Sequence, residues 1–398
     1  MNRKIALILP LVLQVCAQSL AALYLLGFAL WYGLADGLKD SSGTPLGADF
    51  LNVYAAGLMV NRGEAALAYD WQAHWQVQRG VSGYDSAYFG WHYPPMFLAV
   101  ASLVALVPYL WAFAVYIVVT FAGYWAVMRR LAAGSRMSLW LLAAFPGVFA
   151  NIINGQNGFI TTALFGAGMS GLEENPWVAG VLLGLLSYKP QFFVVIPLVL
   201  AVGGYGRAVV ASCLTALVSA GVSWAIFGSA TWMAFFGSAR LTQHVILEQG
   251  STGWKKIQSV FSLVRMWGGS VEAAYALQAG VAVIAIALAL WVWRKKAPMD
   301  IRVAALCGAM LLATPYLLDY DLVILAVPFA FMLRRGLAEG FRRYEAALLG
   351  LLWILPLLAR ELGGAHIPTT PFVLAGMMGL CVFWALYPQG NKKVEDGD

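Results

Sequence analysis

Long apolar runs dominate this chain and restrict its fold more than any other feature. Several reach the ~20 residues that a helix needs to cross a bilayer, among them residues 5–33 and 271–293. The alternation of apolar and polar residues that marks membrane barrels is absent, so helices must satisfy the backbone within the membrane. Only 11% of the residues are charged, against roughly 25% in soluble domains. The sequence predicts an all-α polytopic membrane protein.

Basic residues predict the orientation of the first segments, because they gather on the cytoplasmic side. Arg3 and Lys4 place the N-terminus in the cytoplasm, and residues 5–33 form the first span. A polar loop over residues 34–94 follows on the outer side, and residues 95–128 return. We therefore expect a large first outer loop.

The basic clusters that follow the second span can all be cytoplasmic only if the chain between consecutive clusters crosses the membrane an even number of times. This condition predicts about twelve spanning helices, with both termini cytoplasmic. Three hairpins are expected, with outer tips at residues 151–157, 188–191 and 314–321. An arm such as residues 321–333 reaches only about 20 Å, so we expect short broken helices and recessed tips.

The remaining organisation follows from this topology. A second outer loop is expected over residues 229–257, followed by a short interfacial helix over residues 258–268. We predict a single membrane domain over residues 1–390 and a cytoplasmic tail over residues 391–398.

The first loop contains the run Gly47–Gly57, in which Asp49 precedes a helical segment rich in small residues. Asp49 could cap this helix. It could also act as a general base that removes a proton from a hydroxyl group. Both roles are compatible only if one carboxylate oxygen stays free.

Cationic residues form a second group of candidates. Lys189 lies between apolar arms beside Pro190, where it either snorkels to the interface or neutralises an anionic leaving group such as a lipid phosphate. Lys255, Lys256 and Arg265 could share that task or contact lipid head groups.

Aromatic and amide residues occur at the entry to the second span and at the first tip. His92 lies between Trp91 and Tyr93, which could anchor the helix at the interface or stack on a sugar ring. The amides of the first tip could bind hydroxyls or form a tight turn; they are Asn154, Gln156 and Asn157.

At the third tip, Asp319 and Asp321 flank Tyr320. Asp321 could cap the following arm. Metal binding by the pair is not expected, because no histidine lies nearby in the sequence and the spacing is not that of metal ligands.

Several function classes are excluded or disfavoured. The chain has no P-loop, no dinucleotide-binding glycine motif and no nucleophile elbow, which argues against a nucleotide-driven reaction. Its net charge of +6 reflects the placement of Lys and Arg around the membrane rather than a nucleic-acid partner. The cysteines lie in apolar runs without metal-ligand spacing, as buried apolar residues do; they are Cys16, Cys213, Cys307 and Cys381.

The order of these motifs resembles that of a known family over roughly residues 5–335. The matching features are Gly47–Gly57, Tyr69 with Asp70, Tyr93 to Pro95, Gly155 to Asn157, Lys189 to Gln191, and Pro315 followed by Tyr320 and Asp321. They resemble the polyprenol-phosphate-mannose-dependent glycosyltransferases, family 87 of the GT-C superfamily. No single motif is specific, and their order along the chain carries the resemblance.

The resemblance implies a GT-C-type helix bundle in the bacterial cytoplasmic membrane, with its active site on the periplasmic or outer face. It implies transfer of a hexose, with mannose as the first expectation, from a polyprenyl phosphate to a hydroxyl of a glycan or glycolipid, with inversion. Asp49 would be the general base, and no cofactor or divalent metal is expected. A lipid phosphate is already a good leaving group, so one base and positive charge suffice.

The resemblance and the tips together give the candidate binding residues. The donor phosphate is assigned to Lys189, Lys255, Lys256 and Arg265. Sugar or acceptor contacts are assigned to Tyr54, Asp70, His92, Tyr93, Asn154, Gln156, Asn157, Gln191, His244, Tyr320 and Asp321.

Two other functions stay open at this point. Polar residues at broken helices also mark transport sites, so the chain could be a flippase or transporter of lipid-linked sugars. It could also be a non-catalytic membrane subunit in which Asp49 only caps a helix. The long outer loop, and polar tips expected on one face, favour the transferase.

Overall fold

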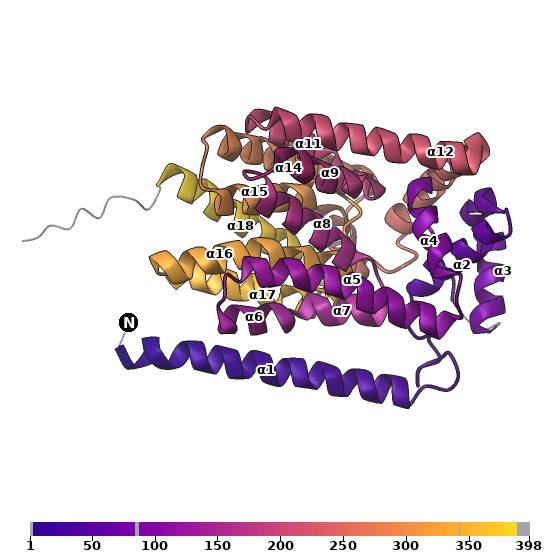
Figure 1. The fold of residues 1–398 in the computed structure, drawn as a ribbon, viewed down its shortest axis with the longest axis horizontal. Helices are drawn as coiled ribbons and strands as arrows, with labels where there is room; N and C mark the ends of the chain where they lie inside the picture. Colours follow the sequence, from indigo (N-terminus) through magenta and orange to yellow (C-terminus); the bar gives the residue numbers. More distant parts are fainter. Residues whose placement is uncertain (1–2, 84–86, 342, 388–398) are drawn as a thin grey trace, which may run out of the picture.

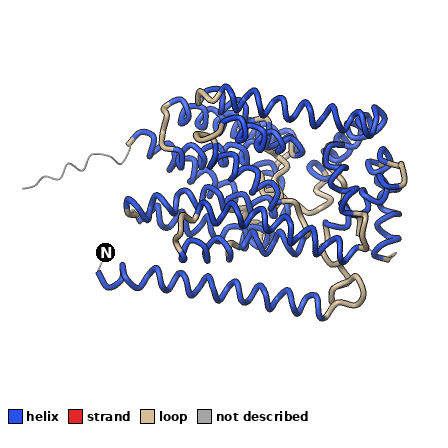
Figure 2. The backbone as a smooth tube through the Cα atoms, in the orientation of Figure 1, coloured by secondary structure: helices blue, strands red, loops and turns tan. Residues whose placement is uncertain are grey.

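The computed structural model describes residues 3–83, 87–341 and 343–387 (Figure 1). Within these ranges the chain forms α-helices, short 3₁₀ helices and one π-helix, with isolated bridges and no β-strand (Figure 2). The predicted all-α class is confirmed.

Six helical segments of the described chain are long and apolar enough to cross a membrane. They are α1 (Arg3–Gly33), α5 (Tyr109–Leu131), α6 with α7 (Arg136–Ala143 and Pro146–Asn154), α12 (Gly206–Thr242) with its continuation to Glu248, α14 (Val271–Arg294) and α17 (Arg343–Gly364). The expected count of about twelve is not confirmed. Other apolar helices are too short by this criterion, as α18 (Thr370–Leu386) illustrates: its 17 residues span about 25 Å at 1.5 Å per residue.

All three predicted tips are breaks between helices. α7 ends at Asn154, and α8 (Gly158–Gly171) begins after a turn. Lys189 separates η3 (Leu185–Tyr188) from α10 (Pro190–Phe193), which is followed by α11 (Val195–Val202). Residues 314–318 separate α15 (Met299–Ala313) from η6 (Asp319–Leu325), which continues into α16 (Ala326–Glu339).

Two predicted segments differ from the structure. The expected second span is divided: η2 (Pro95–Phe97) and α4 (Leu98–Val104) precede α5, which begins after Pro108. The expected second outer loop is largely helical. α12 kinks at Gly228, whose positive φ of 77° redirects the helix, and continues into η4 (Gln243–Glu248). Residues 206–242 thus form two helical parts that meet at Gly228, and the part after the kink occupies most of the expected loop.

The first loop also contains helices: α2 (Phe50–Asn61), η1 (Ala65–Tyr69) and α3 (Trp71–Ser82). Figure 1 shows α2, α3 and α4 at one end of the bundle, which we call the loop end, whereas α1 begins and α18 ends at the opposite end. After α12 come η5 (Trp254–Lys256) and α13 (Val260–Met266), the latter close to the predicted interfacial helix.

α15 lies in the centre of the bundle. Every residue from Ile301 to Leu312 is buried, as expected for a helix that is surrounded by other helices. It packs against α14, α16 and α18 and ends at the third tip, so the core holds this tip in place.

Small residues bring α9 (Pro176–Gly184) into close contact with α12. A Cβ atom on Gly180 would lie 2.5 Å from the carbonyl oxygen of Ala208, and one on Gly184 would lie 2.6 Å from that of Ser212. Glycines four residues apart allow such a backbone approach between membrane helices.

We expect Gly184→Ala to destabilise the protein by about 1–3 kcal/mol, as overpacking typically does. Thermal unfolding in detergent would measure the change. Gly221→Ala on α12 is the matched control, because no atom lies within 4 Å of the added methyl group. Equal unfolding midpoints for the two variants would contradict close packing at Gly184.

Candidate functional site

A cavity of about 450 Å³ lies at the loop end of the bundle. Its wall combines the first loop, all three tips, the segment of α12 after the kink, the region before and within η5, and α17. Polar and aromatic residues that line it include Asp49, Asn52, Tyr88, His92, Tyr93, Gln156, Tyr188, Lys189, Gln191, Thr242, Lys256, Tyr316, Tyr320, Asp321 and Arg360. The structure thus brings together segments that lie more than 300 residues apart along the chain.

Asp49 is fixed by its backbone and by its neighbour Phe50. Gly47 and Ala48 both have positive φ, 80° and 35°, and a non-glycine residue in this region indicates local strain. Phe50 is fully buried. The centroid of its ring lies 5.5 Å from that of Tyr109 and 5.3 Å from that of Phe113. The Asp49 side chain makes no capping hydrogen bond to α2, so the capping alternative does not describe this residue.

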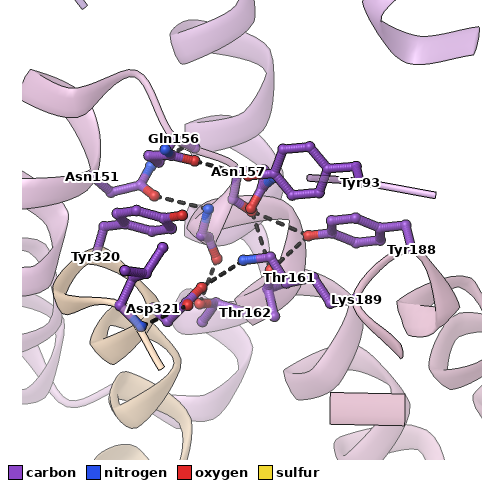
Figure 3. Close-up of polar contacts among 12 residues, drawn as sticks. Tyr93, Asn151, Gln156, Asn157, Thr161, Thr162, Tyr188, Lys189, Tyr320 and Asp321 are labelled. Atoms are coloured by element: carbon purple, nitrogen blue, oxygen red, sulfur yellow. Dashed lines mark hydrogen bonds and ion pairs between the residues drawn. The ribbon is translucent and has the colours of Figure 1, made fainter. Parts of the chain in front are cut away.

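The Asp49 carboxylate instead accepts bonds from two distant segments. Gln156 Nε2 donates to Oδ2 over 2.7 Å, and Lys256 Nζ lies 2.9 Å from Oδ2 and 3.3 Å from Oδ1. The hydroxyl of Tyr93 donates to Gln156 Oε1 over 3.1 Å (Figure 3), which fixes the amide orientation. Oδ1 is the less engaged oxygen, and it is the one available to accept a proton.

The first tip can approach Asp49 only because residue 155 is a glycine. Its φ of +60° is left-handed, and a Cβ atom there would lie 2.4 Å from Phe50 Cβ and 2.8 Å from the carbonyl oxygen of Gly47. The neighbouring Gln156 therefore reaches the carboxylate from a turn that a larger residue would displace.

Lys189 and Asp321 form a second ion pair. Lys189 Nζ lies 2.5 Å from Asp321 Oδ1, and both side chains are 3% exposed (Figure 3). The ammonium also lies 5.6 Å from the ring centroids of Phe192 and Tyr320. Lys189 is thus buried in the protein rather than snorkelling to an interface. Asp321 Oδ2 accepts the backbone N–H of Leu318 over 3.2 Å, so this residue both caps η6 and pairs with Lys189.

A third charged group surrounds Asp319. The guanidinium of Arg360 lies 3.6 Å from Asp319 Oδ2, and the backbone N–H of Tyr320 donates to Oδ1 over 2.9 Å. Burial raises the pKa of Asp319, although Lys256 and Arg360 act in the opposite direction. Burial alone would lower the pKa of Lys256, but the carboxylates of Asp49 and Asp319 outweigh it and raise that pKa. Lys256 is therefore charged at neutral pH.

His92 enters the cavity as a neutral imidazole. Its Nδ1 lies 2.9 Å from the hydroxyl oxygen of Thr242, and burial lowers its pKa to about 4 despite the opposing effect of Asp49. The neighbouring Trp91 is fully buried and packs against Tyr93. These aromatics line a cavity inside the protein, which argues against the interfacial-anchor alternative for them.

His74 joins α3 to α2 beneath the site. It is fully buried; its Nε2 lies 3.0 Å from the carbonyl oxygen of Asn52, and its Nδ1 lies 3.2 Å from Gln78 Nε2. The carbonyl can only accept, so Nε2 carries the proton. Burial lowers the pKa of His74 to about 4.

This lowered pKa predicts loss of stability in acid. The unfolded chain binds a proton at His74 near pH 6.5, whereas the folded chain binds it only near pH 4, so acidification between these values favours unfolding. Lowering the pH from 7 to 5 should remove about 2 kcal/mol through this residue. Chemical denaturation at both pH values should show a smaller difference for His74→Gln than for wild type. An unaltered pH difference in His74→Gln would contradict the assignment.

The cavity takes in many of the residues that the sequence singled out, but not all. Those that line it are Asp49, His92, Tyr93, Gln156, Lys189, Gln191, Lys256, Tyr320 and Asp321. Seven others do not line it: Tyr54, Asp70, Asn154, Asn157, His244, Lys255 and Arg265.

Local contacts or exposure to solvent account for four of these seven. Asp70 is exposed and caps α3 by accepting the N–H of Ala73 over 2.9 Å. Arg265 donates to the carbonyl oxygens of Gly269 and Glu248. His244 and Lys255 are exposed. Direct contact of these residues with a molecule in the cavity is not supported.

Sequence reasoning missed several residues of the wall. Asn52, Tyr88, Tyr188, Tyr316 and Arg360 line the cavity, and Asn52 Oδ1 is buried without a hydrogen-bond partner. Arg360 carried a detectable signal, because in sequence it lies at the opposite end of its apolar run from Arg342 and Arg343, whereas basic residues tend to gather on one side of the membrane. Among the described residues, no group of three or more His, Cys, Asp and Glu side chains is placed to hold a metal ion.

Comparison with known proteins gives one match. The sequence model of glycosyltransferase family 87 matches residues 91–315, more than half of the 398-residue chain. Comparisons with curated proteins and with solved structures gave no match. The matched range includes Tyr93, Gln156, Lys189 and Lys256 of the cavity, whereas Asp49 and Arg360 lie outside it. The chain belongs to glycosyltransferase family 87 and is a membrane glycosyltransferase.

Proposed function

We propose that this glycosyltransferase moves a hexose, with mannose as the first candidate, from a polyprenyl-phosphate donor to a hydroxyl of a glycan or glycolipid. The observation that carries the proposal is a carboxylate with one less engaged oxygen, Asp49 Oδ1, in a cavity that also holds cationic side chains. A general base and positive charge are the two requirements of such a transfer.

The proposed reaction is a direct displacement. The acceptor oxygen forms a bond to the anomeric carbon while the bond from that carbon to the phosphate oxygen breaks. The hydroxyl proton passes to Asp49, and the electron pair of the broken bond stays on the lipid phosphate. One displacement inverts the anomeric configuration, and this chemistry requires no metal or cofactor.

The lipid-linked donor is supported by what the chain contains. No nucleotide-binding motif occurs in the sequence, and the cavity belongs to a protein with six candidate membrane spans among its described residues. A donor anchored in the bilayer would present its phosphate and sugar to such a cavity. The lipid bilayer is then a partner in the reaction, and a nucleic acid is not.

The position of basic residues supports an active site on the outer face of the bacterial cytoplasmic membrane, with cytoplasmic termini. Arg129 and Arg130 occupy the last turn of α5, while its first residue, Tyr109, packs against Phe50 beside Asp49. The basic end of this helix therefore lies away from the cavity, and basic ends face the cytoplasm.

A lipid-linked-sugar transporter is the second candidate. The observation that favours it is the buried pair of Lys189 and Asp321 at two helix breaks, because discontinuous helices with charged groups also form transport sites.

Sugar transfer in proteoliposomes tests the proposal. The donors are labelled polyprenyl-phospho-mannose, other lipid-phospho-hexoses and a nucleotide sugar, with an octyl hexoside and a membrane lipid extract as acceptors. We expect transfer from a lipid-phosphate donor and none from the nucleotide sugar. Movement of the labelled lipid across the bilayer without transfer would instead support the transporter. If neither sugar transfer nor movement of the lipid is observed, the role of a non-catalytic membrane subunit is the one that remains.

A further inference from the structure

Three cationic side chains of the described chain line the cavity, and they differ in how far they are already engaged: Lys189, Lys256 and Arg360. Lys189 is 3% exposed and held by Asp321 at 2.5 Å. Lys256 is 17% exposed and contacts Asp49 at 2.9 Å. Arg360 is 43% exposed, and its ion pair with Asp319 is long at 3.6 Å. Arg360 is thus the cation with the most donor capacity left for an anion in the cavity.

Packing of α17 fixes where Arg360 stands. α17 contacts both η5 and η6. A Cβ atom on Gly363 would lie 3.3 Å from the carbonyl oxygen of Lys255, so this glycine lets the last turn of α17 lie directly against η5. Arg360, one turn earlier, therefore stands beside Lys256 and against Asp319 at the start of η6.

The charges around Arg360 form a balanced group. Asp49 and Asp319 provide two carboxylates, and Lys256 and Arg360 provide two cations, with Asp319 acting on both cations. Asp319 itself is 4% exposed and does not line the cavity. It can hold Arg360 in place from behind without occupying the cavity.

We propose that Arg360 binds the phosphate of the lipid-linked donor and of the lipid phosphate product, and that Asp319 is the positioning residue that orients it. This inference rests on the proposed function and extends it to a residue outside the matched family range. The planar guanidinium offers several N–H groups in a fork that matches phosphate oxygens. Within the described part of the chain, only its Nη1 pairs with a carboxylate, that of Asp319.

The negative charge on the phosphate beside Arg360 increases as the bond to the sugar breaks. The donor phosphodiester carries one negative charge, whereas the released lipid monophosphate approaches −2 at neutral pH, since its second pKa is about 6. A cation at the phosphate therefore stabilises the leaving group more than the bound donor. Arg360 should bind a prenyl monophosphate more tightly than a neutral prenol.

Direct binding to the purified full-length protein tests this without requiring turnover. The probes are farnesyl phosphate and farnesol, with wild type, Arg360→Gln, Arg360→Lys and Arg207→Gln. Arg207 is the control, because it is an exposed arginine near the start of α12 that does not line the cavity. Wild type should prefer the phosphate, and Arg360→Gln should reduce this preference about 10- to 100-fold, as loss of a charged hydrogen bond does.

The other variants give the remaining outcomes. Arg360→Lys should keep part of the preference because it keeps the charge, and Arg207→Gln should match wild type. A wild-type preference that persists fully in Arg360→Gln would overturn the role of Arg360 and leave the proposed function intact. No preference in wild type would overturn both.

Asp319→Asn tests the positioning role with a separate readout. Unfolding midpoints verify that the variant is folded. Its preference for farnesyl phosphate should fall while its affinity for farnesol stays unchanged, since only the orientation of the cation is altered. Equal weakening for both probes would indicate a purely structural role and overturn the assignment of Asp319.

Discussion

Asp49→Asn is expected to lower the rate of sugar transfer by about 10²–10⁴-fold, the usual contribution of a general base. The amide has the same shape as the carboxylate and can keep a contact with Lys256, but it cannot take a proton from the acceptor. The donor phosphate is assigned to the cationic side chains, so the loss of Asp49 should not change the affinity for the donor. The effect should therefore appear in the rate at saturating donor. Initial rates at several donor concentrations, with matched amounts of folded protein, would separate rate from affinity.

Asp70→Asn is the matched control for this experiment. Asp70 lies in the same loop and also precedes a helix, but it caps α3 and does not line the cavity. Asn caps helices about as well as Asp, so we expect the rate of this variant to match that of wild type. If Asp70→Asn were the inactive variant and Asp49→Asn the active one, the base would have to be reassigned.

Lys189→Met is expected to destabilise the protein by about 3–5 kcal/mol, as removal of one partner from a buried ion pair does. Asp321 would keep its charge in a site where it is 3% exposed, without the ammonium that now compensates it. Unfolding midpoints in detergent, together with the yield of folded protein, would measure the loss.

Two further variants test whether the loss of stability depends on burial of the ion pair. Arg130→Met breaks an ion pair with Glu174 whose side chains are 59% and 71% exposed, so a change of at most about 1 kcal/mol is expected. The double variant Lys189→Met with Asp321→Asn removes the unpaired buried carboxylate, and its amide oxygen can still cap η6. This double variant should recover part of the lost stability. Similar losses in the Arg130 and Lys189 variants would count against the importance of the buried pair.

The helix breaks could be predicted from the sequence because their signals are local. Gly155 and Pro190 interrupt apolar runs and stand beside polar residues that are rare at membrane depth. The number of spans is not confirmed in the same way. The expected count depends on crossings between basic clusters, and several apolar helices of the described chain, α18 among them, are shorter than the six candidate spans.

The role of Asp49 illustrates what the sequence leaves open. Asp49 and Asp70 both precede a helix, and the pattern alone allows a cap in either case. The structure separates them, because Asp70 bonds its own helix whereas Asp49 bonds Gln156 and Lys256. Lys256 lies 207 residues away along the chain, and such a pairing is set by tertiary packing.

The partners of Arg360 are likewise set by tertiary packing. Its surroundings, Lys256 and Asp319, come from two other segments that meet α17 only in the folded chain. Lys255 and Arg265 were predicted to share the phosphate because they lie near Lys256 in sequence. Lys255 is exposed, and Arg265 bonds backbone carbonyls, so nearness in sequence did not predict which cation reaches the cavity.

The anomeric configuration of the product tests the central claim most directly. NMR of the glycoside that wild type makes from a lipid-phospho-hexose of defined configuration would report it. One base at Asp49 and a direct displacement predict complete inversion. Retained configuration is incompatible with a single direct displacement, and it would contradict the account.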